Sequence, residues 1–157
     1  MRILLISIIL LTVSCHAQKN IENNITDNCT YYYDKELKKD VYISTEKESE
    51  YPNSLDEHAF IKSILDNIDY SNVAEIWYEE GITPNYLCSI TLDKKGKAIR
   101  CKIAENKNDN IAVLEIKKQI EEIILKGKEW TPAKCNGKEI YSVVNLKIRI
   151  PQSYYLK

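Results

Sequence analysis

The sequence predicts an α+β fold, in which a three-stranded antiparallel sheet carries two helices packed on one face. Three observations lead to this prediction: two stretches with helical spacing of apolar residues, a pair of alternating segments between them, and a final alternating segment near the C-terminus. The chain has 157 residues, of which 44% are hydrophobic and 29% charged. This composition suits one soluble domain with a tail, and we place the domain at residues 51–157.

The first helix is predicted directly after Tyr51-Pro52. Ser54 and Glu57 have the spacing of a capping box, and apolar residues then recur every three or four positions. These residues are Phe60, Ile61, Ile64, Leu65 and Ile68. Residues 73–80 extend the helical structure, with Trp77 on the inner side, before Gly81 and Pro84 end it.

The middle of the domain predicts a β-hairpin followed by a second helix. Residues 86–92 and 98–104 alternate apolar and polar side chains, and Gly96 lies in the turn between them. Residues 111–125 form the second helix, which stops at Gly127. Its apolar side is expected to carry Leu114, Ile120, Ile123 and Ile124.

The last strand is predicted at residues 141–150. Val144, Leu146, Ile148 and Ile150 alternate there with Asn145, Lys147 and Arg149, so that one face packs on the core and the other meets solvent. A helix that leaves the second strand returns the chain to that strand's starting end. The last strand therefore pairs with the first, giving the order second-first-third with a right-handed crossover.

The C-terminal region resembles the end of the TonB C-terminal domain. The resemblance rests on the run W-T-P-A-K-C-N-G-K-E-I from Trp130, on the strand V-V-N-L-K-I-R-I-P after it, and on the Tyr51-Pro52 entry. It implies a TonB C-terminal domain-like fold and a periplasmic protein-binding module rather than an enzyme. Energy transducers of this family also carry an inner-membrane helix and a long Pro-rich spacer, and neither pattern occurs in this sequence. We therefore expect an accessory or adaptor of outer-membrane transport.

The expected binding site is the free edge of the last strand. In the TonB family this edge receives a short extended segment of an outer-membrane receptor, and edge strands in general accept added strands. The candidate partner-binding residues are Tyr141, Val143, Asn145, Lys147 and Arg149. The alternative is a self-associating structural envelope lipoprotein without a peptide ligand, in which two such edges pair.

The N-terminus predicts export from the cytoplasm. Residues 1–17 combine Arg2, a short apolar run and small residues, as in a secretory signal. The run before Cys15 is similar to a bacterial lipobox, which would place a lipid anchor on Cys15, whereas cleavage after Ala17 would release a free periplasmic protein. Residues 18–50 are rich in Asn, Lys, Asp and Glu and predict a flexible polar tether in the periplasm or cell envelope. Tyr31-Tyr32-Tyr33 and Val41-Tyr42-Ile43 interrupt it, either as short strands or a sticky patch or, as we expect, as tyrosines that pack locally on the neighbouring domain.

Four further cysteines form an even set for an oxidising compartment: Cys29, Cys88, Cys101 and Cys135. The alternation places Cys88 and Cys101 on the inward face of neighbouring strands, as a disulfide or as two buried thiols. Cys29 and Cys135 then remain as a second candidate pair, which would fix the tether to the domain.

The sequence gives little support for other function classes. Without residues 1–17 the chain has 22 − 1 = 21 basic and 23 acidic side chains, a balance that predicts no nucleic-acid partner. Its four glycines form no phosphate-binding loop, and the exposed-helix pattern around His58 predicts no metal site. We expect no cofactor, no metal and no catalytic residues.

Overall fold

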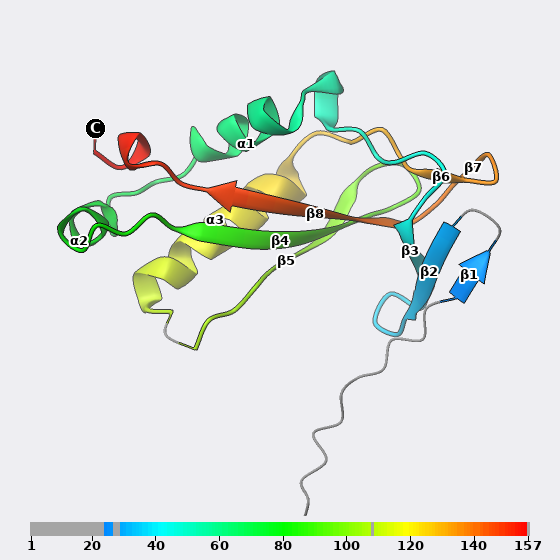
Figure 1. Ribbon diagram of the computed structural model, residues 1–157, viewed down its shortest axis with the longest axis horizontal. Coiled ribbons are helices and arrows are strands. Elements are labelled where there is room, and N and C mark those ends of the chain that lie inside the picture. The colour runs from blue at the N-terminus through cyan, green and yellow to red at the C-terminus, as the bar shows by residue number, and fades with distance from the viewer. Residues whose placement is uncertain (1–23, 27–28, 108, 157) are drawn as a thin grey trace, which may run out of the picture.

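The structure, a computed structural model, describes residues 24–26, 29–107 and 109–156. The predicted signal, with Cys15, and the first part of the predicted tether lie outside these residues. Figure 1 shows a sheet flanked by helices. The elements are β1 (Asn24–Thr26), β2 (Cys29–Asp34), β3 (Lys39–Ser44), η1 (Pro52–Ser54), α1 (Glu57–Leu65), α2 (Ala74–Glu79), β4 (Asn85–Leu92), β5 (Ala98–Ile103), α3 (Ile111–Lys126), β6 (Lys134–Cys135), β7 (Lys138–Glu139), β8 (Ser142–Arg149) and η2 (Gln152–Tyr154).

The fold is α+β, but the prediction of a three-stranded antiparallel sheet is wrong. The described residues form a six-stranded mixed sheet in the order β1-β2-β3-β8-β4-β5, and β6 and β7 form a separate two-stranded sheet. The central strand β4 is antiparallel to both of its neighbours, β5 and β8, whereas β3 joins β8 in parallel. The sheet is larger because the chain before residue 51 contributes strands to it.

Residues 29–44, assigned above to a flexible tether, are β2, β3 and the turn between them. Five residue pairs join β2 to β3, and Val41 is completely buried. The polar composition favoured disorder, but tyrosines and Val41 provide the apolar contacts of a strand pair, and the domain provides a surface for them. The amino-acid composition of a segment contains no information about the surface on which it will pack.

One hydrophobic cluster joins α1, α2 and α3 to a single face of β4, β5 and β8. Its most deeply buried members are Ile64, Val73, Cys88, Ile90, Leu92, Ile116, Ile120, Leu146, Ile148 and Ile150. Along β4 and β8 these residues have even numbers, because successive side chains of a strand point to opposite faces. Odd-numbered residues of β4 and β8 therefore lie on the opposite face, which we call the outer face.

Two details of the predicted helices are wrong. Asp56, rather than Ser54, caps α1, since its carboxylate accepts a hydrogen bond of 2.7 Å from the Ala59 backbone N–H. On α3, Leu114 is exposed, whereas Ile116 is buried together with Ile120 and Ile124. The buried side of α3 is thus rotated about the helix axis from the predicted side. Several sides of this helix are similarly hydrophobic, and packing against β5 determines which of them is buried.

The segment around Trp130 is held against the β4–β5 turn. The Trp130 backbone N–H donates to the Gly96 carbonyl at 2.9 Å, and the indole packs against Tyr51 and Phe60. Gly96 has a φ of 82°, and a Cβ at this position would lie 1.8 Å from the Trp130 carbonyl oxygen. Glycine is therefore required both for the turn and for the close approach of the Trp130 backbone.

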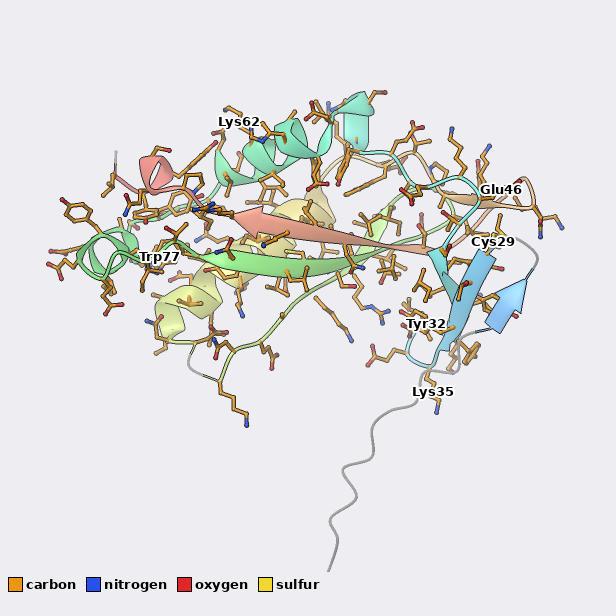
Figure 2. The ribbon with its side chains drawn as sticks, in the orientation of Figure 1. Cys29, Tyr32, Lys35, Glu46, Lys62 and Trp77 are labelled. Carbon is orange, nitrogen blue, oxygen red and sulfur yellow. A yellow bond between two sulfur atoms is a disulfide. The ribbon has the colours of Figure 1, made fainter. Side chains whose placement is uncertain are left out.

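A disulfide between Cys29 and Cys135 joins the β2–β3 hairpin to the strand β6. Figure 2 shows Cys29 at the end of the hairpin nearest to β6, with Lys35 in the turn at the opposite end. Cys29, Ala133, Cys135 and Ile140 form a second, smaller apolar cluster. The bridge spans 106 residues of sequence and thus connects the first strands of the domain to the loop before its last strand.

Replacing both Cys29 and Cys135 by alanine should lower the free energy of unfolding by about 2–4 kcal/mol, because the bridge closes a long loop in the unfolded chain. Urea denaturation followed by circular dichroism measures this difference. The wild-type protein in dithiothreitol is the control and should approach the stability of the double variant. Equal stability of the oxidised and reduced wild-type protein would contradict a structural role for the bridge.

Candidate functional site: the open edge of β8

The backbone of β8 is paired on one side along its whole length. Eight residue pairs join it to β4, from Asn85 opposite Arg149 to Leu92 opposite Ser142. The Ile150 N–H also donates to the Pro84 carbonyl at 3.0 Å. Residues of an antiparallel strand point their backbone groups alternately to one side and to the other, so the even-numbered residues of β8 bond to β4. The odd-numbered ones point away from β4.

Among the strands that the structure describes, the opposite side of β8 has a neighbour only at its beginning. There the Tyr42 N–H donates to the Tyr141 carbonyl at 2.9 Å, and Tyr42 pairs with Ser142. The expectation of a neighbour on one side only is therefore wrong at this end of the strand. Beyond Ser142, no other strand of the part of the chain that the structure describes pairs with this side. The Val143 N–H belongs to this parallel pairing with Tyr42, so the open edge consists of the Val143 C=O and of the backbone N–H and C=O groups of residues 145, 147 and 149.

Four of the five predicted partner-binding residues lie on this open edge: Val143, Asn145, Lys147 and Arg149. Val143 is half-buried and the other three are exposed. The fifth, Tyr141, is already engaged, because its carbonyl accepts the bond from β3 and its ring lies 6.0 Å from the Lys94 Nζ. The structure therefore moves the start of the site from Tyr141 to Val143.

A groove of about 350 Å³ lies at the beginning of the open edge, where the chain leaves β3. Its lining comes from the start of β8, from the stretch between the end of β3 and the start of α1, and from the residue before β6. The residues are Ile43, Thr45, Glu48, Ser49, Tyr51, Glu57, Ala133, Ser142, Val143, Val144 and Asn145. The segment before α1 is held in place by pairing of Lys47 with Lys134 and of Glu50 with Thr131. The sequence did not indicate this groove, because four of its eleven lining residues lie in the predicted tether and the others come from separate parts of the chain.

Tyr51 and Glu57 give the groove a polar end. The Tyr51 hydroxyl donates to Glu57 Oε2 at 3.2 Å. Burial, with the Glu57 charge nearby, raises the pKa of Tyr51 to about 12, so its hydroxyl keeps its proton at neutral pH. Glu48 adds a second carboxylate to the lining. This end of the edge is therefore acidic.

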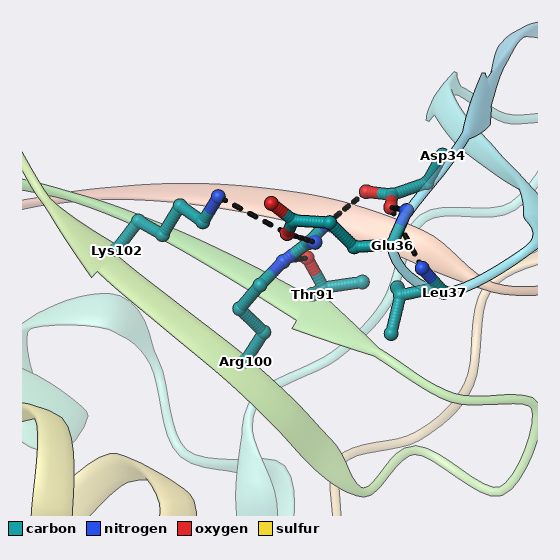
Figure 3. A network of polar contacts seen from close by, with 6 residues as sticks. All are labelled: Asp34, Glu36, Leu37, Thr91, Arg100 and Lys102. Atoms are coloured by element: carbon teal, nitrogen blue, oxygen red, sulfur yellow. Dashed lines mark hydrogen bonds and ion pairs between the residues drawn. The ribbon is translucent and has the colours of Figure 1, made fainter.

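The hairpin that closes the beginning of the edge is fastened across the outer face of the sheet. Figure 3 shows Arg100 of β5 reaching Asp34 at the end of β2 and Glu36 in the β2–β3 turn. Arg100 Nε also donates to the Thr91 hydroxyl at 3.4 Å. Because Asp34 is buried and accepts further bonds from the Glu36 and Leu37 N–H groups, this contact fixes the turn. The position of β3 beside β8 thus depends on both the disulfide and Arg100.

The Arg100 hydrogen bond lowers the pKa of Asp34 to about 2, from an ordinary value of 3.8. The folded-state pKa is the lower one, so the ionised carboxylate stabilises the fold above pH 3.8, and this contribution is lost as the pH falls towards 2. Replacing Asp34 by asparagine should therefore cost roughly 2 kcal/mol of unfolding free energy at pH 6 and almost nothing at pH 2.

Urea denaturation of both proteins at several pH values between these limits measures the difference. Glu36→Gln is the matched control, because Glu36 contacts the same Arg100 from an exposed position. An exposed ion pair contributes at most about 1 kcal/mol, so this variant should show a much smaller pH dependence. A pH-independent cost of Asp34→Asn would contradict the assigned role of the carboxylate.

Cys88 and Cys101 are free thiols in the core, which decides between the two alternatives predicted for them. The register places Cys101 opposite Ile90 and Cys88 opposite Ile103, so the two cysteines are diagonal neighbours on the inward face. A hydrogen bond between the thiols, together with burial, raises the pKa of Cys101 above its ordinary value. The pair fills the core as small apolar side chains do.

Lys117 and Asp109 form a buried ion pair that the sequence analysis also missed. Lys117 Nζ lies 2.6 Å from Asp109 Oδ2 and donates to the Ala104 carbonyl, which ties α3 to the end of β5. The hydrogen bond from Lys117 lowers the pKa of Asp109. The nearby Tyr86 hydroxyl is buried without a hydrogen-bond partner. This cluster lies away from the groove, and its contacts account for the packing of α3.

Within the described ranges, no helix has the length and apolar character needed to cross a membrane. No group of three or more His, Cys, Asp or Glu side chains in this part of the chain has an arrangement that could hold a metal ion. His58 is exposed in the first turn of α1. Comparisons with protein-family models, with curated proteins and with solved structures found no match for this chain.

Proposed function

We propose that this protein is a binding module of the cell envelope that receives an extended segment of another protein along the open edge of β8. The observation that carries the proposal is the row of unpaired backbone groups formed by the Val143 C=O and by residues 145, 147 and 149. An extended chain laid beside them would continue the sheet, and its backbone would supply the complementary donors and acceptors. The resemblance to the TonB C-terminal domain supports a periplasmic role as an accessory of outer-membrane transport.

The surroundings of the edge favour an added strand. The part of the edge beyond Ser142 is straight and fully paired to β4 on its other side, so it is already fixed in an extended conformation. A preorganised edge loses little conformational entropy on binding. The pairing of β3 with Ser142 ends the available edge on one side, and this limits the segment to about seven residues opposite residues 143–149.

A second candidate function is self-association through the same edge. The odd-numbered residues all point to the open side, so two copies related by a two-fold axis at Leu146 would place Asn145 of one opposite Lys147 of the other. This register satisfies the antiparallel hydrogen-bond pattern. The protein would then be a structural envelope dimer, lipid-anchored if Cys15 is acylated, without a peptide ligand.

Replacing Asn145 by proline should weaken strand addition without unfolding the domain. Proline removes one N–H donor that points to the open side, and proline is tolerated on edge strands when its missing donor faces solvent. Loss of one backbone hydrogen bond corresponds to a roughly three- to tenfold weaker association. The free energy of unfolding should change by less than about 1 kcal/mol.

Asn145→Ala is the control, because it keeps the backbone donor and removes only the side chain. Crosslinking capture from envelope extract, quantified by mass spectrometry, should find partners that are retained by Asn145→Ala and depleted by Asn145→Pro. Light scattering of the purified protein tests the second candidate, which requires a wild-type dimer that Asn145→Pro dissociates. If both variants capture the same proteins and remain monomeric like the wild type, the edge is not a binding site.

A further inference from the structure

The outer face beside the open edge carries positive charge that no ion pair of the described residues neutralises. Lys147 and Arg149 are exposed on β8, and neither forms an ion pair with any residue that the structure describes. On β5, Lys102 is also exposed, and its contact with Glu36 is long, at 3.5 Å. Arg100, in contrast, has both Asp34 and Glu36 as partners. The uncompensated cations therefore lie at the far end of the edge from β3.

The inward side of the same edge is apolar. Val144, Leu146 and Ile148 point to the core, and Leu146 and Ile148 are completely buried. A strand added beside β8 would alternate its side chains in the same way, since neighbouring strands share the pleat. Its inward side chains would lie next to Val144, Leu146 and Ile148, and its outward side chains next to Val143, Asn145, Lys147 and Arg149.

The two ends of the edge differ in charge. Glu48 and Glu57 line the groove at the beginning, and Lys147 and Arg149 occupy the other end. Directly opposite side chains on neighbouring strands attract when their charges differ and repel when their charges are alike. Acidic side chains are thus favoured opposite Lys147 and Arg149 and disfavoured at the groove.

We infer that the segment received by this edge alternates apolar and acidic side chains, with its acidic residues opposite Lys147 and Arg149. This inference rests on the proposed function, because it assumes that a strand is added to β8. It specifies the chemistry of the partner: an extended, negatively charged segment of another protein, with apolar residues at every second position and with no acidic residue at the groove end.

A second copy of the chain fits this edge less well than an acidic segment. In the two-fold register, Lys147 and Arg149 of both copies would lie on one continuous outer face, with the two Lys147 side chains as diagonal neighbours. Four cations would then share this face, and like charges at such short range oppose pairing. An acidic segment neutralises the same cations.

Two labelled peptides of about seven residues test the inference by fluorescence polarisation. Both have valine at the inward positions and serine at the outward positions opposite Val143 and Asn145. At the outward positions opposite Lys147 and Arg149, the valine–glutamate peptide has glutamate and the valine–lysine peptide has lysine. The valine–glutamate peptide should bind the wild-type protein at least about tenfold more tightly, and added salt should reduce the difference. The double variant Lys147→Glu/Arg149→Glu should reverse the preference.

Matched variants separate the inference from the proposed function. Lys118→Glu/Lys128→Glu changes the net charge by the same amount at exposed positions of α3 and of the loop after it, and it should leave the preference unchanged. Asn145→Pro should weaken binding of the valine–glutamate peptide.

Each of the other outcomes contradicts either the inference or the proposed function. Suppose that Asn145→Pro weakens binding of both peptides, but Lys147→Glu/Arg149→Glu changes the preference no more than Lys118→Glu/Lys128→Glu does. Strand addition is then supported, and the inferred preference for acidic residues is wrong. If Asn145→Pro has no effect on a peptide that binds, the proposed function is wrong. If the wild-type protein binds neither peptide, or prefers the valine–lysine peptide, the inferred chemistry of the partner is wrong.

Discussion

The register between β4 and β8 is the constraint on which the rest of the structure depends. It places Cys88 opposite Leu146 and Ile90 opposite Val144, so that the buried side chains of both strands face the helices together. The same register decides which backbone groups of β8 remain unpaired. A slip of one residue would expose Leu146 and Ile148 to solvent and turn the backbone groups of residues 143, 145, 147 and 149 towards β4. Core packing therefore maintains the open edge.

The hairpin β2–β3 determines where the open edge begins. It pairs with β8 at a single position, and it is held there from two ends by the Cys29–Cys135 bridge and by Arg100. Neither fastening lies on β8 itself. The length of the open edge is thus set by contacts that reach β8 only through the hairpin. A change in the hairpin would lengthen or shorten the proposed binding surface without changing the strand.

The two ends of the open edge differ in charge. Backbone hydrogen bonds alone accept any extended chain, whereas the carboxylates of the groove and the cations of Lys147 and Arg149 distinguish one sequence pattern from another. The cations also have a second effect, since exposed charges on an edge strand hinder unspecific pairing between copies. In the proposed function, the same two side chains both protect the edge and select the added strand.

The sequence by itself determined the two main helices, the β4–β5 hairpin and the inward and outward sides of the last strand. In the last strand, apolar residues alternate with polar ones, and this was enough to assign an inward and an outward face. The apolar or polar character of a strand side chain indicates whether it is buried. The residues are Val144, Leu146 and Ile148 on the inward face and Asn145, Lys147 and Arg149 on the outward face. The sequence did not determine β3, the groove or the Arg100 contact. These features join residues far apart in the chain, such as Arg100 with Asp34 and Cys29 with Cys135. The stability of β2 and β3 comes from those contacts, and composition alone predicted a tether because it contains no information about the surface on which a polar segment will pack.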